Sequence, residues 1–477
     1  MIKYPEYKPE KVQEDLREIL PEDAISKSIF ERINNSLDPY TGATDITPDE
    51  VPYAVVWPKS TEEVSRIMTY ANSKQIPVYV RGSGTSLHGA AKFHRRGIVL
   101  NVRRLNRLEI NKADQYFECG AGLRCLDVKE RLAKEGYFLP MAPGSIRVAS
   151  MGGLVSNNTT AHAIDSALGK PRDYVIGLDV VLATGEVLHV GSKSHRRIAG
   201  TDLTQYFVGG DGILGIITNI RMRLMPMFKS AYGVAFFDDL IPLARSAQRI
   251  YQENAPLPLF LELLDKRCAE LTFEIQGLPK PSGPLIMFHA MGVNEDAATY
   301  KINRIVEVIK KEHPIEAKRI TDVEEWDKIW LARESALPFV IQGGKGTFAL
   351  AEIVSTVGGL VDCMKDVMHM GKGMPTLDEL GDPYIFGHIG ALTFHPTYII
   401  PVVWPAEKKA EAVAEMFQKE ADLNIKYETT GGEWGQFCKR SAFFVRRYGE
   451  KAYQLVRGIK KVFDPNDILN PNILPEE

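Results

Sequence analysis

Three glycine clusters in the first half of the chain constrain its fold more than any other feature. They span residues 82–89, 144–153 and 209–215, with strand-like apolar runs between them. Glycines let backbone N–H groups approach a ligand, and successive N–H groups in a tight turn form a concavity that binds anions. A single glycine-rich loop is often only a turn. Three of them indicate one long cofactor with a pyrophosphate, held from several sides.

The surrounding pattern predicts a β-α-β unit that leads into the first cluster. Residues 52–58 are typical of a strand, Ser60 and the acidic residues after it of a helix start, and residues 76–80 of a second strand. A helical arm is predicted before this unit, in residues 7–36. No G-x-G-x-x-G motif opens a helix after the first strand, so the pattern differs from the dinucleotide fingerprint.

The predicted fold class is α+β with mixed sheets in the first half. Residues 98–119 alternate strand-like runs with charged turns, and residues 125–134 are typical of a helix. Residues 174–190 predict a hairpin that turns at 183–186. From residue 231 to residue 311 the pattern is β-α-β-β-α, which predicts an antiparallel sheet covered by helices.

The length of 477 residues exceeds that of one hydrophobic core, so more than one domain is expected. We expect a two-part cofactor-binding domain with its helical arm over residues 1–226 and a substrate or cap domain over residues 227–425. The C-terminal segment, 426–477, is expected to return to the first domain.

Composition excludes several classes of protein. The chain has 58 basic and 61 acidic residues and a formal net charge of −3, without a basic tract, so nucleic acid is not an expected partner. No run of 18 apolar residues occurs and the first residues are polar, so we expect a cytoplasmic protein without a signal peptide. Five cysteines show neither C-x-x-C nor iron–sulfur spacing, which predicts reduced thiols.

Four stretches of the chain together resemble one known family. They are PYAVVWPKSTEEV at 52–64, RGSGTSLHGA at 81–90, SMGGLVSNN at 150–158 and AGTDLTQYFVGGDGILGIIT at 199–218. The family is the FAD-linked oxidases of the vanillyl-alcohol oxidase type, and the most similar branch is the glycolate and D-lactate dehydrogenases, the D-2-hydroxyacid dehydrogenase group. The stretch FDPNDILNP at 463–471 is similar to the family's closing signature.

The resemblance implies that the glycine clusters hold FAD. In some related flavoenzymes a histidine of the first loop bonds the flavin covalently, but Thr85 stands at that position and His88 follows three residues later, so we expect non-covalent FAD. For His162, a packing or capping role is favoured over contact with the flavin. The predicted FAD-binding residues are Arg81, Gly82, Ser83, Gly84, Thr85, Ser86, Gly89, Pro143, Gly144, Ser145, Met151, Gly152, Gly153, Ser156, Asn157, Asn158, Gly212, Gly215 and Ile217.

Two histidines in the second half, His388 and His395, are candidates for chemistry. On a regular strand their odd separation would point them to opposite faces, so a shared role needs a turn, for which Gly387 and Gly390 provide freedom. Their stretch resembles the family's G-H-x-G-D-G-N-x-H segment, whose histidines bind a divalent metal in some members. The resemblance implies Glu433 as the third ligand of a zinc or manganese ion.

The sequence departs from the family pattern at this site. Ala391, Leu392 and Thr393 replace Asp-Gly-Asn, and Trp434 replaces a histidine that is a candidate base. Tryptophan cannot accept a proton at neutral pH. Three alternatives follow: one of the two histidines is the base without a metal, a metal-bound hydroxyl loses its proton to another group, or the substrate is not a simple hydroxy acid.

A substrate carboxylate also needs a cation. The stretch from Trp330 to Arg333 resembles the family's W-x-x-R segment, whose arginine can clamp a carboxylate through its planar fork. A surface charge is the alternative for an arginine on a helix. Lys345 is a second candidate for the contact.

The resulting hypothesis is an FAD-dependent dehydrogenase with catalytic residues His388, His395 and Arg333. It would oxidise a hydroxy acid by hydride transfer to flavin N5 and pass electrons to a separate acceptor, such as an electron-transfer flavoprotein, an iron–sulfur subunit or a quinone-linked partner. The rival hypothesis is a flavin-bearing subunit of a larger redox complex with an eroded site. A flavoenzyme for a bulkier apolar or aromatic substrate lies between them, and the pattern leaves formation of a homo-oligomer open.

Overall fold

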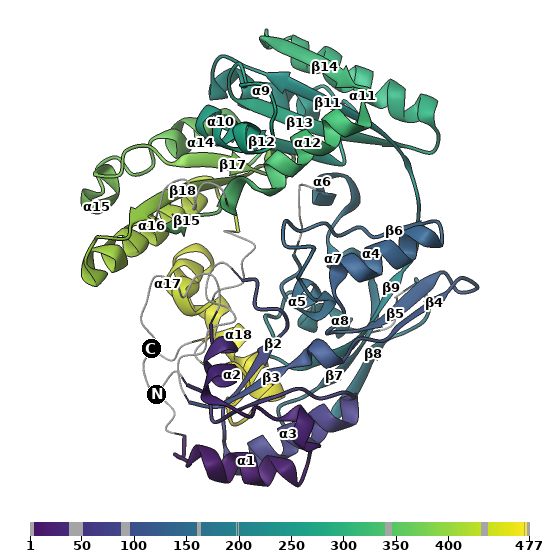
Figure 1. The fold of residues 1–477 in the computed structure, drawn as a ribbon, viewed down its shortest axis with the longest axis vertical. Helices are drawn as coiled ribbons and strands as arrows, with labels where there is room; N and C mark the ends of the chain where they lie inside the picture. The colour runs from purple at the N-terminus through teal and green to yellow at the C-terminus, as the bar shows by residue number, and fades with distance from the viewer. Residues whose placement is uncertain are drawn as a thin grey trace. The chain divides into compact units, whose positions relative to one another are not determined.

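The computed structural model describes most of the chain, as two compact units (Figure 1). The described residues are 4–37, 51–86, 96–159, 164–196, 198, 200–338, 346–430, 437–471 and 473–474. The first unit comprises residues 1–159, 170–226 and 433–477, and the second comprises residues 160–169 and 227–432. Each unit contains helices and sheets, which confirms the α+β fold class.

The first unit opens with a small parallel sheet. Its strands are β1 (Ala54–Val56), β2 (Val78–Arg81) and β3 (Ile98–Asn101), in the order β1-β3-β2. Helix α3 (Thr61–Lys74) connects β1 to β2, and the Ser60 side chain accepts the Glu63 N–H at its start. The expected β-α-β unit is present, but β1 and β2 each pair with β3 instead of with each other.

A five-stranded antiparallel sheet forms the rest of the first unit's framework. Its order is β4 (Leu108–Asn111), β5 (Tyr116–Gly120), β9 (Ile216–Arg223), β7 (Val175–Val181) and β8 (Val187–Gly191). The predicted hairpin turn at 183–186 joins β7 to β8, and the predicted helix at 125–134 is α4 (Cys125–Lys134). The other helices and strands of this unit are α1 (Pro9–Arg17), η1 (Glu22–Ala24), α2 (Ile29–Asn34), η4 (Val102–Arg104), β6 (Tyr137–Phe138), α5 (Met151–Ser156), α7 (Pro171–Tyr174), α8 (Thr204–Phe207), β10 (Met225–Pro226), α17 (Phe437–Tyr448) and α18 (Glu450–Phe463).

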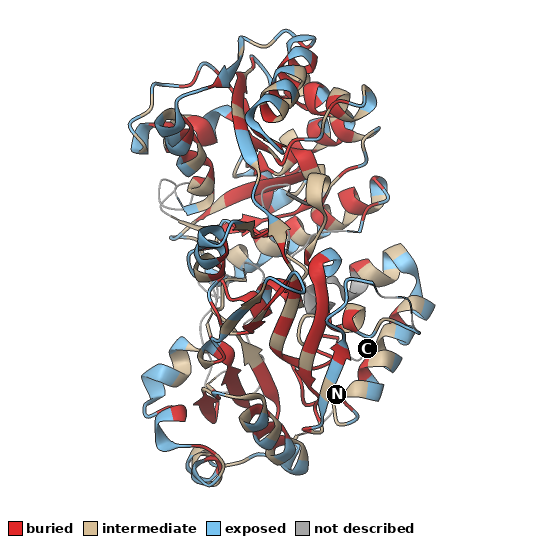
Figure 2. Ribbon diagram, turned by 90° about the vertical axis from the view of Figure 1, so that its right-hand side faces the viewer, coloured by how far each residue is buried: buried red, intermediate tan, exposed pale blue. Residues whose placement is uncertain are grey.

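The second unit is built on an antiparallel sheet covered by helices, as expected. The strand order is β14 (Glu316–Ile320), β11 (Lys229–Phe236), β13 (Leu285–Gly292), β12 (Phe260–Leu264), β17 (Tyr384–Gly387), β18 (Thr393–Pro401) and β15 (Gly346–Leu350), and β16 (Ile353–Val354) also pairs with β18. The helices are α6 (Ile164–Leu168), α9 (Leu240–Gln252), α10 (Lys266–Ile275), α11 (Glu295–Lys310), α12 (Val323–Glu334), α14 (Leu360–Met368), α15 (Pro375–Asp378), η5 (Ile389–Ala391) and α16 (Ala406–Lys426). Figure 2 shows buried residues concentrated on the strands and exposed residues on the helices.

Helix α10 corrects the β-α-β-β-α pattern expected for this unit. It lies between β12 and β13, where the pattern has two consecutive strands. The Asp265 side chain begins the helix by accepting the Cys268 N–H at 2.7 Å, and Cys268, Ala269 and Phe273 form its buried face. Among the described residues, no helix is both long and apolar enough to cross a membrane.

Candidate functional site

The first two glycine clusters meet in the first unit. Gly82 follows β2, and a Cβ atom there would collide with the Ser150 hydroxyl, which lies within the second cluster. Ser150 is 3% exposed, and its Oγ has no hydrogen-bond partner among the described residues. Buried hydroxyls normally have a partner. A bare backbone beside an unsatisfied hydroxyl fits a site that a polar ligand completes, and the sequence interpretation missed Ser150.

Glycine is required for different structural reasons at different positions of the clusters. Gly84 has φ +69°, a conformation that other residues adopt only under strain, and a Cβ on Gly144 would meet no atom within 4 Å. By contrast, a Cβ on Gly152 would lie 2.6 Å from the Ala121 Cβ, and one on Gly215 would collide with Val180. Gly144 therefore has open space beside its backbone, whereas a Cβ on Gly84 would collide with the Arg81 guanidinium. Gly152 and Gly215 are needed for packing inside the protein.

Asn470 connects the first cluster to the third. Its Oδ1 accepts the Val80 N–H at 3.0 Å, and its Nδ2 donates to the carbonyl oxygens of Asp211 and Gly212 at 3.2 and 3.0 Å. Its own N–H donates to the Val78 carbonyl at 2.8 Å. One amide side chain therefore sets the spacing between the end of β2 and the Gly212 turn.

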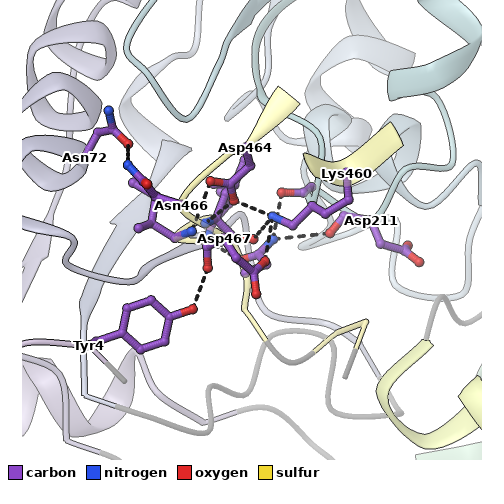
Figure 3. Close-up of polar contacts among 12 residues, drawn as sticks. Tyr4, Asn72, Asp211, Lys460, Asp464, Asn466 and Asp467 are labelled. Atoms are coloured by element: carbon purple, nitrogen blue, oxygen red, sulfur yellow. Dashed lines mark hydrogen bonds and ion pairs between the residues drawn. The ribbon is translucent and has the colours of Figure 1, made fainter. Parts of the chain in front are cut away.

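A buried ion pair holds the segment that carries Asn470 (Figure 3). Lys460 Nζ pairs with Asp464 and donates to the Leu469 carbonyl at 2.7 Å. The Asp464 carboxylate accepts the N–H groups of Ile468 and Leu469 at 3.0 and 2.7 Å. The tail resembling the closing signature is thus a structural clamp on the first unit. The sequence signal for it was the polar residues of FDPNDILNP, but their partners could not be read from it.

The predicted FAD-binding residues, apart from Gly89 outside the described residues, all lie in the first unit. Arg81 ends β2, and Ser83, Thr85 and Ser86 lie in the loop after it. Pro143, Gly144 and Ser145 lie in the turn before α5, which contains Met151, Gly153 and Ser156. Asn157 and Asn158 follow α5, and Ile217 lies on β9. His88 and His162 also fall outside the described residues.

In the second unit, Glu262 lies on β12, and His388 directly follows the neighbouring strand β17. The β12–β17 register pairs Leu263 with Gly387, which brings the residues next to them, Glu262 and His388, close together. Asp265 reinforces this register, because its carboxylate accepts the Ile385 N–H at 2.7 Å. His388 Nδ1 lies 3.0 and 2.9 Å from the two oxygens of Glu262, which is 0% exposed.

Arg333 joins this pair from helix α12. Its Nη2 lies 2.7 Å from Glu262 Oε2, and the guanidinium carbon lies 5.3 Å from the centre of the Phe386 ring. Arg333 is 4% exposed, so it is a buried cation and not a surface charge. We name Glu262, Arg333 and His388 the Glu262 cluster.

His395 lies beside the Glu262 cluster. The ring centroids of His388 and His395 are 5.0 Å apart, with the ring planes at 84°. The turn that brings them together consists of η5 and Leu392, which adopts a left-handed conformation with φ 59°. The expected freedom of Gly387 and Gly390 is therefore not what turns the chain. Gly387 instead permits close approach, because a Cβ there would lie 2.5 Å from the Thr393 carbonyl oxygen.

An aromatic layer lies next to the cluster. Trp330 of α12 stacks on Phe260 of β12 with centroids 4.8 Å apart, and Trp326 stacks on Tyr232 of β11 at 4.5 Å. His289 of β13 packs against Tyr232 and Phe260, and its burial lowers the pKa of its imidazole to about 3. Phe260 and Glu262 are two residues apart on one strand, so they share the sheet face that α12 covers.

The metal prediction has two of its three ligands within the described residues. His388 and His395 are adjacent, while Glu433 and Trp434 fall outside the described residues, as does Lys345. Within the described ranges, no three or more His, Cys, Asp and Glu side chains form a group that could hold a metal ion. The metal site stays a prediction, because its third ligand, Glu433, lies outside the described residues.

Glu262 is the residue of this site that sequence reasoning missed. Its signal was present, since a single carboxylate interrupts an otherwise apolar run in LFLELL at 259–264. A carboxylate within a fully buried strand requires a cationic or hydrogen-bonding partner. Which partner it finds depends on strand pairing, which the sequence pattern did not predict.

Comparison with known proteins gives two family matches that together span most of the chain. Residues 52–191 match the FAD binding domain, and residues 228–473 match the C-terminal domain of FAD linked oxidases. The first region contains the predicted FAD-binding residues except Gly212, Gly215 and Ile217. The second contains the Glu262 cluster.

Similar proteins span nearly the same length. The chain is 28% identical over 440 residues to the glycolate oxidase subunit GlcD of Bacillus subtilis, covering 90% of each chain. It is 28% identical over 431 residues to a D-lactate dehydrogenase of Archaeoglobus fulgidus, covering 88% of this chain and 90% of the relative. A D-2-hydroxyglutarate dehydrogenase of Stutzerimonas stutzeri is 23% identical over 431 residues, with the same shares covered.

Solved structures show the same fold at lower identity. A p-cresol methylhydroxylase with bound substrate has a TM-score of 0.78 at 15% identity, covering 99% of this chain and 97% of its own. A 4-ethylphenol oxidase from Gulosibacter chungangensis has a TM-score of 0.77 at 17% identity, covering 99% and 98%. At this identity the likeness concerns the fold alone.

Proposed function

The chain belongs to the family of FAD-linked oxidases, and from that premise we propose that it is a dehydrogenase for a 2-hydroxy acid of the D-lactate, glycolate or D-2-hydroxyglutarate class. The observation that carries the proposal is the Glu262 cluster, in which a buried guanidinium and an imidazole share one carboxylate. The names of three relatives agree with this substrate class. The electrons would pass to a separate protein acceptor.

The first unit would hold FAD without a covalent bond. The Ser150 hydroxyl, the lack of side chains at Gly82 and Gly84, and the open space beside Gly144 fit the polar pyrophosphate of the cofactor. Thr85 has no nucleophilic nitrogen to bond the flavin. When bound, FAD supplies the two-electron acceptor that takes a hydride at N5.

The second unit would bind the substrate and take its proton. Glu262 Oε2 lies 2.7 Å from Arg333 Nη2, and Arg333 Nε is buried without a hydrogen-bond partner among the described residues. This remaining edge of the guanidinium suits a substrate carboxylate. Because His388 Nδ1 faces Glu262, its Nε2 is the nitrogen suited to accept the proton of the substrate hydroxyl, while the hydride leaves from the carbon of that hydroxyl.

A weakly bound zinc or manganese ion remains part of the proposal. Histidines that bind metals usually donate their other ring N–H to a carboxylate, and Glu262 offers that arrangement to His388. His388, His395 and Glu433 would be the ligands. In the metal-free alternative, His388 or His395 acts as an unassisted base.

The proposal is tested by anaerobic mixing of the yellow protein with D-lactate, glycolate, D-2-hydroxyglutarate and a set of aromatic alcohols. We expect a hydroxy acid to bleach the flavin absorbance, and Arg333→Met to raise KM for that acid more than it lowers kcat. Bleaching by aromatic alcohols alone would refute the acid substrate, and bleaching by none would favour the non-catalytic flavin-bearing subunit. Acid precipitation should leave about one FAD per chain in the supernatant, as non-covalent binding requires.

A further inference from the structure

We propose that Glu262 is a positioning residue that determines which nitrogen of His388 carries the proton and which edge of Arg333 faces the substrate. This inference rests on the proposed function, which it deepens. Glu262 connects three elements, because it lies on β12, His388 directly follows β17 and Arg333 lies on α12. It would act through its two neighbours and not on the substrate itself.

The buried Glu262 carboxylate is stabilised by the Arg333 guanidinium. The residue is 0% exposed on a strand whose neighbours Leu261, Leu263 and Leu264 are equally buried. A buried carboxylate is unfavourable unless it is paired and hydrogen-bonded. Arg333 supplies a cation at 2.7 Å, so the carboxylate is ionised and can only accept hydrogen bonds.

The ionised carboxylate selects one tautomer of His388. Nδ1 lies within hydrogen-bond distance of both Glu262 oxygens, so in the neutral imidazole Nδ1 must carry the proton. The lone pair is then on Nε2. This holds whether Nε2 takes a substrate proton or binds a metal ion. Arg333 Nη2 lies 3.4 Å from His388 Nδ1 because two donors converge on one carboxylate oxygen.

The same carboxylate orients the guanidinium. Glu262 Oε2 binds Nη2, and the Phe386 ring lies at 5.3 Å from the guanidinium carbon. Nε is buried and has no partner among the described residues, so a ligand oxygen on that edge would complete the guanidinium. Glu262 therefore presents an imidazole lone pair and a guanidinium edge in a fixed relation.

A purely structural ion pair is the alternative, and the second unit contains a matched control for it. Glu312 is 7% exposed and pairs with two arginines, Arg245 at 3.2 Å and Arg249, and with no histidine of the described part of the chain. Glu312→Gln thus removes a buried carboxylate from two arginines that are not part of the Glu262 cluster. It should lower stability and leave kcat and the imidazole signals unchanged.

Glu262→Gln is the decisive substitution because glutamine has one acceptor oxygen and one donor group. Arg333 requires the acceptor, so the amide nitrogen turns to His388, whose Nδ1 must then accept and whose proton moves to Nε2. We expect kcat to fall by about 10²-fold, in the range found when a partner that orients a histidine is removed, with a smaller change in KM.

The double variant Glu262→Gln/Arg333→Met separates positioning from structure. Without the guanidinium, the amide oxygen is free to turn to His388 and accept its Nδ1 proton again. We expect kcat to recover about tenfold over the single variant, while KM for the hydroxy acid rises. A structural role predicts that the second substitution makes kcat lower still, and that result would overturn the proposal.

Nitrogen NMR of the histidine side chains tests the tautomer without turnover. In the flavin-loaded protein treated with chelator, the His388 signals, assigned by their loss in His388→Gln, should show the proton on Nδ1 in wild type and on Nε2 in Glu262→Gln. A proton on Nε2 in wild type, or no change in the variant, would overturn the inference. If no substrate reduces the flavin, the proposed function fails while this measurement still decides the role of Glu262.

Discussion

The glycine loops of the first unit and the Glu262 cluster of the second unit are built by different means. The proposed binding by the loops uses backbone N–H groups and needs glycine at positions 82 and 84, where a Cβ would collide with Ser150 or with the Arg81 guanidinium. The cluster depends on three particular side chains from three elements. A site formed by backbone can be recognised in the sequence as a contiguous glycine motif. A site formed by side chains from several elements can be recognised only when the pairing of the strands is known.

Substitution of Gly84 should abolish cofactor binding by the glycine loops of the first unit. In Gly84→Val, a β-branched residue occupies a position with φ +69°, which costs about 1–2 kcal/mol and moves the N–H groups of the loop away from the ligand. We expect the purified variant to be colourless with a largely intact fold, measured by the flavin-to-protein absorbance ratio and circular dichroism. Gly458→Ala is the control, since a Cβ there meets no atom within 4 Å. A yellow variant would mean that this loop is only a turn.

Metal removal should affect the second region alone. Glu262 contacts Nδ1 of His388 and can orient this metal ligand. Ala391 and Leu392, however, offer no polar side chain to the ligands, and loss of such partners costs about 10–100-fold in metal affinity. We expect sub-stoichiometric zinc or manganese in protein purified without chelator, its loss in His388→Ala and Glu433→Ala, and lower turnover after chelation with FAD retained.

The control for the metal experiment is His369→Ala, because His369 pairs with Asp382 outside the cluster, at 2.9 Å. It should retain the metal. If the purified protein contains no metal and chelators do not change its turnover, the metal prediction is wrong. His388 or His395 would then act as an unassisted base.

A smaller effect should come from His289, whose neutral imidazole lies among the aromatic rings of the second unit. Burial lowers its folded-state pKa to about 3, below the unfolded value of 6.5, so the unfolded chain binds more protons between these two pH values. Stability from this group is therefore complete above pH 6.5 and falls as the pH drops. At pH 5 the loss is about 2 kcal/mol.

The measurement is the free energy of unfolding in denaturant at pH 7.5 and pH 5. His289→Phe should reduce the difference in unfolding free energy between pH 7.5 and pH 5 by about 2 kcal/mol. The control is His313→Asn, which should leave this difference unchanged because His313 is exposed. If the free energy of unfolding falls by the same amount between pH 7.5 and pH 5 in wild type and in His289→Phe, His289 does not contribute to the acid sensitivity.

Local patterns allowed much of the fold to be predicted. Helix α4 begins and ends at the predicted residues, because its apolar spacing is complete within ten residues, and Ser60 caps α3 as its sequence indicates. Pairing was less accessible. That β1 and β2 each lie beside β3 depends on contacts distant in sequence, and α10 was missed because its capping residue, Asp265, directly follows a strand.

The candidate sites follow the same division. The glycine clusters were identified because each is contiguous in the sequence. Glu262 and His388 are 126 residues apart, and Asn470 lies 390 residues from Val80. In each pair, the sequence around one residue does not indicate the other residue. Their burial and hydrogen bonds therefore became known only from the structure.

The contact of Asn470 with Val80 also determines when during synthesis the first unit can acquire its cofactor. At translation rates of about 5–20 residues per second, the 390 residues between them take roughly 20–80 s to emerge. During that interval the loop after β2 exists without its amide clamp. The clamp therefore forms late in synthesis, and we expect ribosome-bound fragments that stop before residue 460 to remain without cofactor.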